Sequence, residues 1–148
     1  MDRAIHLAED NVTAGGGPFG AVLVTPDGRE FTGTNRVTAI PDPTAHAEIL
    51  ALRAAAEALG TADLRGSVLH ASCEPCPMCL TAALWARVDR LVHAATRTDA
   101  ARSGFDDEEF YRQVRAPRVT AMVMEHEPHP ARLTPFAAWD DHDGRTPY

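Results

Sequence analysis

Two short motifs hold three side chains that bind zinc well and one carboxylate that can carry protons. The first is His-Ala-Glu at residues 46–48, and the second is Pro-Cys-Pro-Met-Cys at residues 75–79. A structural zinc site usually has four protein ligands, whereas a catalytic site has three and keeps a position open for water. The pattern therefore predicts zinc on His46, Cys76 and Cys79. Glu48, two residues from a ligand, is the expected general base and general acid.

A closed structural zinc site is the main alternative, because CxxC pairs are also common in structural zinc sites and in redox proteins. Cys73 would be the fourth ligand in such a site. This alternative gives Glu48 no task. Cys73 also precedes a Glu-Pro pair that is typical of a turn, so we expect it to be a buried neighbour of the zinc site.

Two helix starts are expected to position the ligands. An apolar pattern over residues 45–59 predicts a helix with Asp42 as its cap and Pro43 in its first turn. A second helix is expected over residues 76–86. Cysteines three apart at its start share one face, and the positive end of the helix favours their thiolate forms.

The remaining periodicities predict an α/β fold, a helix-covered mixed sheet of five strands. Helices are expected over about the first dozen residues and over 106–114, and a short apolar segment spans 133–139. A Pro-Asp-Gly-Arg turn at 26–29 predicts a hairpin. The expected strands are 21–25, 30–35, 68–72, 91–95 and 119–124.

Length and charge limit the possible functions. The 148 residues, 45% of them hydrophobic, are enough for one domain covering residues 1–148 but too few for two. A formal charge of −7 argues against nucleic acid and favours a small-molecule substrate. There is no long apolar stretch, and the three cysteines lie within seven residues, so we expect a cytoplasmic protein with no membrane contact.

Five segments, which are spread over nearly the whole length, give the chain a strong family resemblance. They are GGPFGAVLV from Gly16, DPTAHAEILALR from Asp42, SCEPCPMCLTAALWAR from Ser72, TDAARSGFDDEEFY from Thr98 and LTPFAAWDD from Leu133. With these segments the chain resembles the bacterial guanine deaminases of the cytidine-deaminase-like superfamily, whose signature is H-x-E followed by P-C-x-x-C.

This resemblance implies a three-layer α/β/α fold, one zinc ion per subunit and Glu48 as proton shuttle. It implies a homodimer in which the C-terminal segment, about residues 131–148, is exchanged between subunits. It also assigns a set of substrate contacts, with Asn35 as a hydrogen-bonding partner of the purine. The contacts are Phe19, Asn35, Ala47, Trp85, Asp107 and Tyr148.

The reaction expected from these residues is hydrolysis of guanine to xanthine and ammonia. A related alternative is deamination of cytosine, cytidine or another nucleoside or aminated ring, and deamination of adenosine in tRNA is less favoured by the charge. An alternative of another class is a noncatalytic module held together by zinc.

Overall fold

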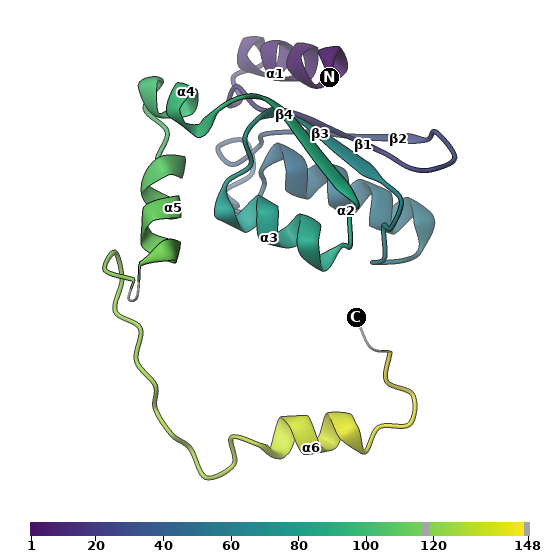
Figure 1. Cartoon of the computed structure of the whole chain (residues 1–148), viewed down its shortest axis with the longest axis vertical. Coiled ribbons are helices and arrows are strands. Elements are labelled where there is room, and N and C mark those ends of the chain that lie inside the picture. The colour runs from purple at the N-terminus through teal and green to yellow at the C-terminus, as the bar shows by residue number, and fades with distance from the viewer. Residues whose placement is uncertain (117–118, 147–148) are drawn as a thin grey trace.

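A mixed four-stranded sheet is the centre of the fold (Figure 1) in the computed structural model, which describes residues 1–116 and 119–146. The strand order is β2-β1-β3-β4. β1 is antiparallel to both β2 and β3, whereas β3 and β4 are parallel. The α/β class and the hairpin are as predicted. The strands are β1 (Gly20–Val24), β2 (Glu30–Thr34), β3 (Val68–Cys73) and β4 (Arg90–Ala95).

Helices cover both faces of this sheet, which confirms the three layers. α1 (Asp2–Thr13) lies on one face, and α2 (Ala47–Leu59) and α3 (Pro77–Trp85) lie on the other (Figure 1). Side chains alternate along a strand, so β1 directs every second residue to the core beneath α2. The buried members of that core are Ala21, Leu23, Ala47, Ala51, Leu52, Ala55, Leu64, Leu69 and Ala83.

Two glycines let helices lie directly against the strands. A β-carbon at Gly33 of β2 would be 2.0 Å from the carbonyl oxygen of Ala47 in α2. A β-carbon at Gly20 of β1 would be 2.3 Å from the carbonyl oxygen of Ala4 in α1. Neither separation is sterically possible, so only glycine, which has no β-carbon, fits at these two positions. Gly33 thereby sets how closely the start of α2 approaches the sheet.

The start of α2 differs from the sequence prediction. The helix begins at Ala47 with His46 as its N-cap, and Asp42 is not the cap. The Oδ1 atom of Asp42 instead accepts hydrogen bonds from the backbone nitrogen and hydroxyl of Thr44, at 2.8 and 2.7 Å. An aspartate followed by proline fits a turn as well as a helix start, and here it forms the turn.

α3 links β3 to β4 in the expected βαβ arrangement, and a short helix that we did not predict follows. This helix is α4 (Arg97–Arg102). Its start is a capping box, in which Asp99 N donates to Thr96 Oγ1 at 3.2 Å and Thr96 N donates to Asp99 Oδ2 at 2.9 Å. The Thr-x-x-Asp spacing was therefore a usable signal.

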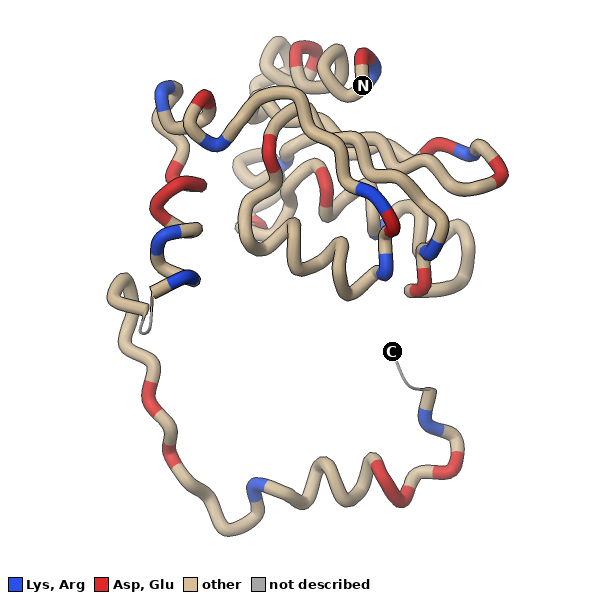
Figure 2. The backbone as a smooth tube through the Cα atoms, viewed as in Figure 1, with Lys and Arg blue, Asp and Glu red and all other residues tan. Residues whose placement is uncertain are grey.

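α5 (Asp107–Arg115) confirms the helix expected at the acidic run. Its first turn contains Asp107, Glu108 and Glu109, and its last turn contains Arg112 and Arg115. Figure 2 shows this succession of red and blue along the helix. Acidic residues at the N-terminus and basic residues at the C-terminus both interact favourably with the helix dipole.

The predicted fifth strand is wrong, because described residues 119–124 have no strand structure. The Gln113 side chain takes the hydrogen bonds that a strand would direct to a neighbour. Its Oε1 atom accepts from the backbone nitrogens of Thr120 and Ala121, at 2.8 and 3.2 Å. This segment has the composition of a strand but pairs with no strand in the described chain. β4 is therefore an edge strand of the sheet.

The C-terminal segment extends away from the layers (Figure 1). It contains α6 (Thr134–Asp140), in which no residue is buried. Leu133, Phe136 and Trp139 are 62%, 67% and 41% exposed. Among the described residues, no helix combines the length and apolar content needed to cross a membrane.

Candidate active site

Three potential zinc ligands converge where α2 and α3 begin. The Nδ1 atom of His46 lies 3.6 Å from the Sγ atom of Cys76 and 3.5 Å from that of Cys79, and the two sulfurs are 3.6 Å apart. A tetrahedral site with ordinary Zn–N and Zn–S bonds has N–S edges of about 3.6 Å and S–S edges of about 3.8 Å. These atoms therefore fit three corners of a zinc tetrahedron.

Both ligand-bearing helices start with an unusual N-cap. His46 and Cys76 have the extended backbone of N-cap residues, but neither side chain caps its helix. Serine, threonine, aspartate and asparagine normally fill this position, because their oxygens accept hydrogen bonds from the first helical turn. Here the cap side chains face a shared site instead. The positive ends of α2 and α3 both favour the negative sulfurs there.

The contact between the two cysteine ligands moves their pKa values in opposite directions, so that one sulfur loses its proton easily and the other keeps it. The contact with Cys79 lowers the pKa of Cys76 to about 4, and His46 acts in the same direction. The same contact, together with burial, raises the pKa of Cys79. Zinc binds thiolates, so metal binding releases the remaining proton from the pair.

Glu48 lies beside the ligands in the first turn of α2. Its side chain is buried, with the residue only 7% exposed, and burial is the main reason that its pKa is raised. A carboxyl group with a raised pKa can both accept and donate a proton near neutral pH. The geometry therefore fits the predicted roles, in which three side chains bind the metal and Glu48 beside them carries protons.

Cys73 is not part of this cluster. Among the described residues, the group of candidate ligand atoms lying within 4.8 Å of one another consists of His46, Cys76 and Cys79. The Cys73 Sγ donates to the carbonyl oxygen of Thr96 at 3.5 Å, and burial raises its pKa to about 11. Because Cys73 lies outside the cluster of candidate ligand atoms, the closed four-ligand alternative lacks its fourth ligand among the described residues.

A cavity of about 310 Å³ opens beside the metal ligands. His46, Glu48 and Cys76 line it, and so do three of the predicted substrate contacts: Phe19, Asn35 and Asp107. Burial raises the pKa of Asp107, and the charge on Cys76 adds to this. The Asn35 amide is held by its Oδ1 atom, which accepts from Val37 N at 3.4 Å.

Two other predicted contacts, Trp85 and Ala47, are not among the described residues that line this cavity. Trp85, at the end of α3, lies in a separate depression with Ile49, Leu52 and Ala82, so its place in one subunit does not support a role in the pocket. Its sequence position at the end of an apolar helix gave no direction for the side chain. Ala47 is buried in the sheet–helix core. Tyr148 lies outside the described residues.

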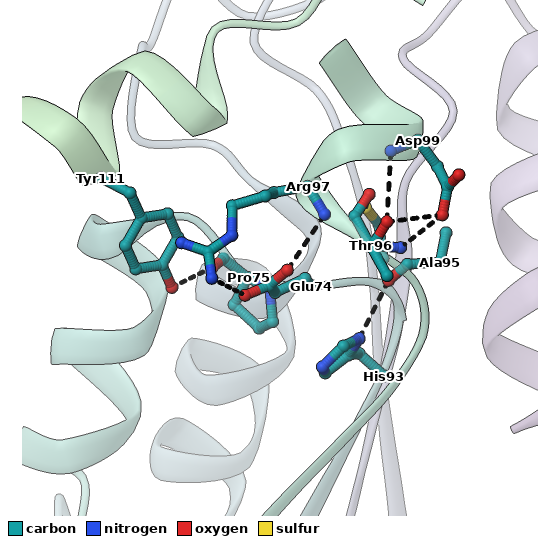
Figure 3. A network of polar contacts seen from close by, with 9 residues as sticks. Glu74, Pro75, His93, Ala95, Thr96, Arg97, Asp99 and Tyr111 are labelled. Atoms are coloured by element: carbon teal, nitrogen blue, oxygen red, sulfur yellow. Dashed lines mark hydrogen bonds and ion pairs between the residues drawn. The ribbon is translucent and has the colours of Figure 1, made fainter. Parts of the chain in front are cut away.

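The cavity also contains residues that sequence reasoning missed. Phe105 contributes a wall, and its ring meets that of Phe19 edge to face with centroids 4.7 Å apart. Glu74 lines the cavity too and pairs with Arg97 of α4 (Figure 3). The position of Glu74 immediately before the Pro-Cys pair was the available signal. For Phe105 the sequence offered no signal other than the acidic run that follows it.

Comparison with known proteins decides the family. A family model described as the cytidine and deoxycytidylate deaminase zinc-binding region matches residues 1–95. The chain belongs to this deaminase family. The matched residues include both predicted motifs, and the three donor atoms have the tetrahedral spacing described above. The protein is therefore a zinc-dependent deaminase, with His46, Cys76 and Cys79 positioned to bind the metal.

Relatives of this deaminase include enzymes for free bases and for tRNA. Guanine deaminase of Bacillus subtilis is 43% identical, over 100% of this chain and 96% of that protein, and its X-ray structure has a TM-score of 0.93 over 99% of this chain and 95% of that chain. The structure of guanine deaminase from Nitrosomonas europaea has a TM-score of 0.67 at 39% identity, and the match covers 72% of this chain and 62% of that chain. The tRNA-specific adenosine deaminase of Haemophilus influenzae is 39% identical over 86% of this chain and 75% of that protein.

Proposed function

We propose that this deaminase hydrolyses guanine to xanthine and ammonia. The observation that carries the proposal is the likeness to Bacillus subtilis guanine deaminase over the whole chain. In the reaction a water oxygen bonds to the ring carbon that bears the amino group. The carbon–nitrogen bond then breaks, and the nitrogen leaves as ammonia. A cavity of about 310 Å³ is near the lower limit of ligand pockets and suits a free base.

Glu48 carries the protons in this proposal. When bound, zinc supplies an open coordination position at which the pKa of water falls to about 7. The Glu48 carboxylate accepts a proton from the attacking water and delivers it to the ring nitrogen. It then accepts the second water-derived proton from the hydroxyl group newly bonded to the ring carbon and passes it to the departing amine, which leaves as ammonia. Its burial and its place two residues after His46 support this role, because the carboxyl group stays close to the metal without being a ligand.

Asn35 and Asp107 are the proposed recognition residues. The Asn35 amide offers a donor and an acceptor to the purine edge, and its backbone is fixed because Asn11 Nδ2 donates to Asn35 O at 2.8 Å. The Asp107 carboxylate accepts hydrogen bonds from N–H groups of the base. Phe19 packs against the ring. Ala47 and Tyr148 are kept as contacts on the strength of the family resemblance alone.

An ammonia-release assay tests the substrate. Zinc-loaded protein is given guanine, cytosine, adenine, guanosine, cytidine and adenosine under the same conditions. We expect guanine to have a kcat/KM at least about 100-fold above the others, since a site built for one set of hydrogen bonds strongly rejects analogues that lack them. Faster turnover of a nucleoside or of cytosine would overturn the substrate assignment.

Deamination of adenosine in tRNA is the second candidate, because of the likeness to the Haemophilus influenzae enzyme. The formal charge of −7 opposes it, since binding to phosphates depends on clustered Lys and Arg. A tRNA substrate incubated with the protein and sequenced for inosine separates the two candidates. Inosine formation without guanine turnover would favour the tRNA reaction.

We also propose a homodimer in which the segment of about residues 131–148 crosses to the partner subunit. Three apolar side chains around α6 are exposed, and the described part of the segment, residues 131–146, lies apart from the sheet and its helices (Figure 1). Such side chains normally require a covering surface. A cytoplasmic location belongs to the same proposal and is supported by the free thiols that the zinc site needs.

Subunit complementation tests the exchange. Subunits with Glu48→Gln and subunits with Tyr148→Ala are unfolded together and refolded as mixed dimers. If Tyr148 reaches the partner's cavity, one site per mixed dimer regains both Glu48 and Tyr148, and activity returns to about a quarter of wild type. If each tail stays with its own subunit, no mixed dimer has a complete site and activity does not return. Light scattering checks that dimers form.

A further inference from the structure

Residues from α4 and α5 hold the loop that precedes the first cysteine ligand (Figure 3). Arg97 donates from its backbone nitrogen to Glu74 Oε2 at 3.0 Å and from Nη2 to Glu74 Oε1 at 3.1 Å. The Tyr111 hydroxyl donates to the carbonyl oxygen of Pro75 at 2.8 Å. Both residues immediately before Cys76 are therefore anchored from outside the β3–α3 unit.

The two anchors also support each other. The guanidinium carbon of Arg97 lies 4.2 Å from the centroid of the Tyr111 ring (Figure 3). Tyr111 is buried, and the side chains of Arg97 and Glu74 are only 26% and 19% exposed. Ion pairs and cation–π contacts at partly buried sites are screened less than those in open solvent. Arg97 thus fixes the tyrosine ring and the glutamate together.

α5 connects this network to the cavity. Asp107 lies four residues before Tyr111, so the two side chains share one face of the helix. Asp107 lines the cavity beside His46 and Glu48, whereas the Tyr111 hydroxyl ends on the ligand loop. A shift of Tyr111 relative to Pro75 would therefore change the distance between Asp107 and the metal ligands.

We propose that Tyr111 is a positioning residue whose hydrogen bond to Pro75, supported by Arg97 and Glu74, sets the separation between the Asp107 carboxylate and the zinc-ligand loop. Tyr111 acts through these neighbours and is not among the residues that line the cavity. The inference rests on the proposed function, in which Asp107 binds the base. It assigns the α4–α5 region a part in fixing the substrate relative to the metal.

A double-mutant cycle tests this. Tyr111→Phe keeps the ring over Arg97 and removes only the hydroxyl, and it is measured alone and combined with Asp107→Asn. We expect kcat/KM to fall about 10-fold in the wild-type background, because a buried carbonyl loses its partner, and less than about 2-fold in the Asp107→Asn background. Zinc content should remain one ion per subunit.

Arg112→Ala is the matched control. Arg112 is also on α5, but its ion pair is with Glu109 on the same helix, so its loss should leave kcat/KM unchanged. An equal 10-fold loss in both backgrounds would overturn the inference, as would loss of zinc from Tyr111→Phe. If Tyr111→Phe does not fold, Arg97→Lys enters the same cycle, since it keeps a charge for Glu74 but lacks the planar group.

The wild-type measurement separates this inference from the proposed function. If the wild type releases ammonia from another base but not from guanine, the substrate assignment fails. The cycle is then run with that base. Non-additive effects of the Tyr111 and Asp107 substitutions would support the positioning role, and additive effects would overturn it, whichever base is the substrate.

Discussion

The Nδ1 atom of His46 lies 3.5 Å from the Sγ atom of Cys79, although the two residues are 33 positions apart in the sequence. Two separate strand–helix connections end at this point, and neither helix start uses its N-cap side chain for its own backbone. The site therefore depends on how α2 and α3 pack against the same face of the sheet. A bound metal would join the two helix starts directly.

Metal removal is expected to cost both activity and stability. A chelator should abolish ammonia release and lower the thermal unfolding temperature by roughly 5–15 °C, because zinc binds the folded site in preference to the unfolded chain. Scanning fluorimetry with elemental analysis measures this. Added zinc should restore both properties, and magnesium should restore neither. Full activity at less than about 0.1 zinc per subunit would contradict the site.

Glu48→Gln separates proton transfer from metal binding. The substitution keeps the size of the side chain but removes the ionisable group, so kcat should fall by about 10²–10⁴-fold while zinc content is unchanged. Glu57→Gln, on an exposed turn of the same helix, is the matched control and should behave as wild type. A Glu48→Gln enzyme with more than a tenth of the wild-type kcat would exclude Glu48 as the proton carrier.

Substitutions of Cys73 and Cys76 should give opposite results. Cys73→Ser should keep one zinc per subunit and most of the activity, since a serine hydroxyl can also donate to Thr96 O. Cys76→Ser should lose most of the zinc, because a hydroxyl replaces a thiolate ligand. Elemental analysis of both purified variants makes the comparison. Loss of zinc from Cys73→Ser would revive the closed four-ligand site.

His70 is expected to make stability depend on pH. Its pKa is lowered, first by burial and then by the charges of the N-terminus and Arg90, while Glu30 opposes them weakly. Its Nδ1 atom is buried without a hydrogen-bond partner among the described residues. Below a pH of about 6.5 the unfolded chain then binds more protons than the folded one, so stability is lost as the pH falls toward the folded pKa.

Urea unfolding at pH 7.5 and pH 5.5 measures this effect. The free energy of unfolding should fall more between these values for the wild type than for His70→Gln, which has no group titrating there. Because both proteins share every other titratable group, the difference between the two falls belongs to residue 70. Equal falls would show that His70 has the same pKa in the folded and unfolded states.

Local signals explain what could be predicted from the sequence. The ligand motifs, the hairpin around residues 26–29 and the helices of the layers depend on neighbouring residues, and each was located within a few positions. The start of α2 was displaced because Asp42 and Pro43 fit a turn as well as a cap. The capping box of α4 is a local signal of the same kind, a threonine followed three positions later by an aspartate.

Tertiary contacts explain the rest. The segment at 119–124 has the composition of a strand, but a strand requires a neighbour, and Gln113 binds its backbone instead. Phe105 reaches the cavity only because the chain turns between α4 and α5. The direction of Trp85 likewise depends on the face that α3 presents to α2. No property of these residues in isolation contains that information.

Gly33 shows how vulnerable the active centre is to changes made elsewhere. It neither binds the metal nor lines the cavity, yet a single added methyl group would collide with the backbone of α2 and displace the histidine ligand and the proton carrier as one unit. Inactivating substitutions should therefore accumulate at this strand position as readily as at the ligands themselves. A search for inactive variants limited to the pocket would overlook it.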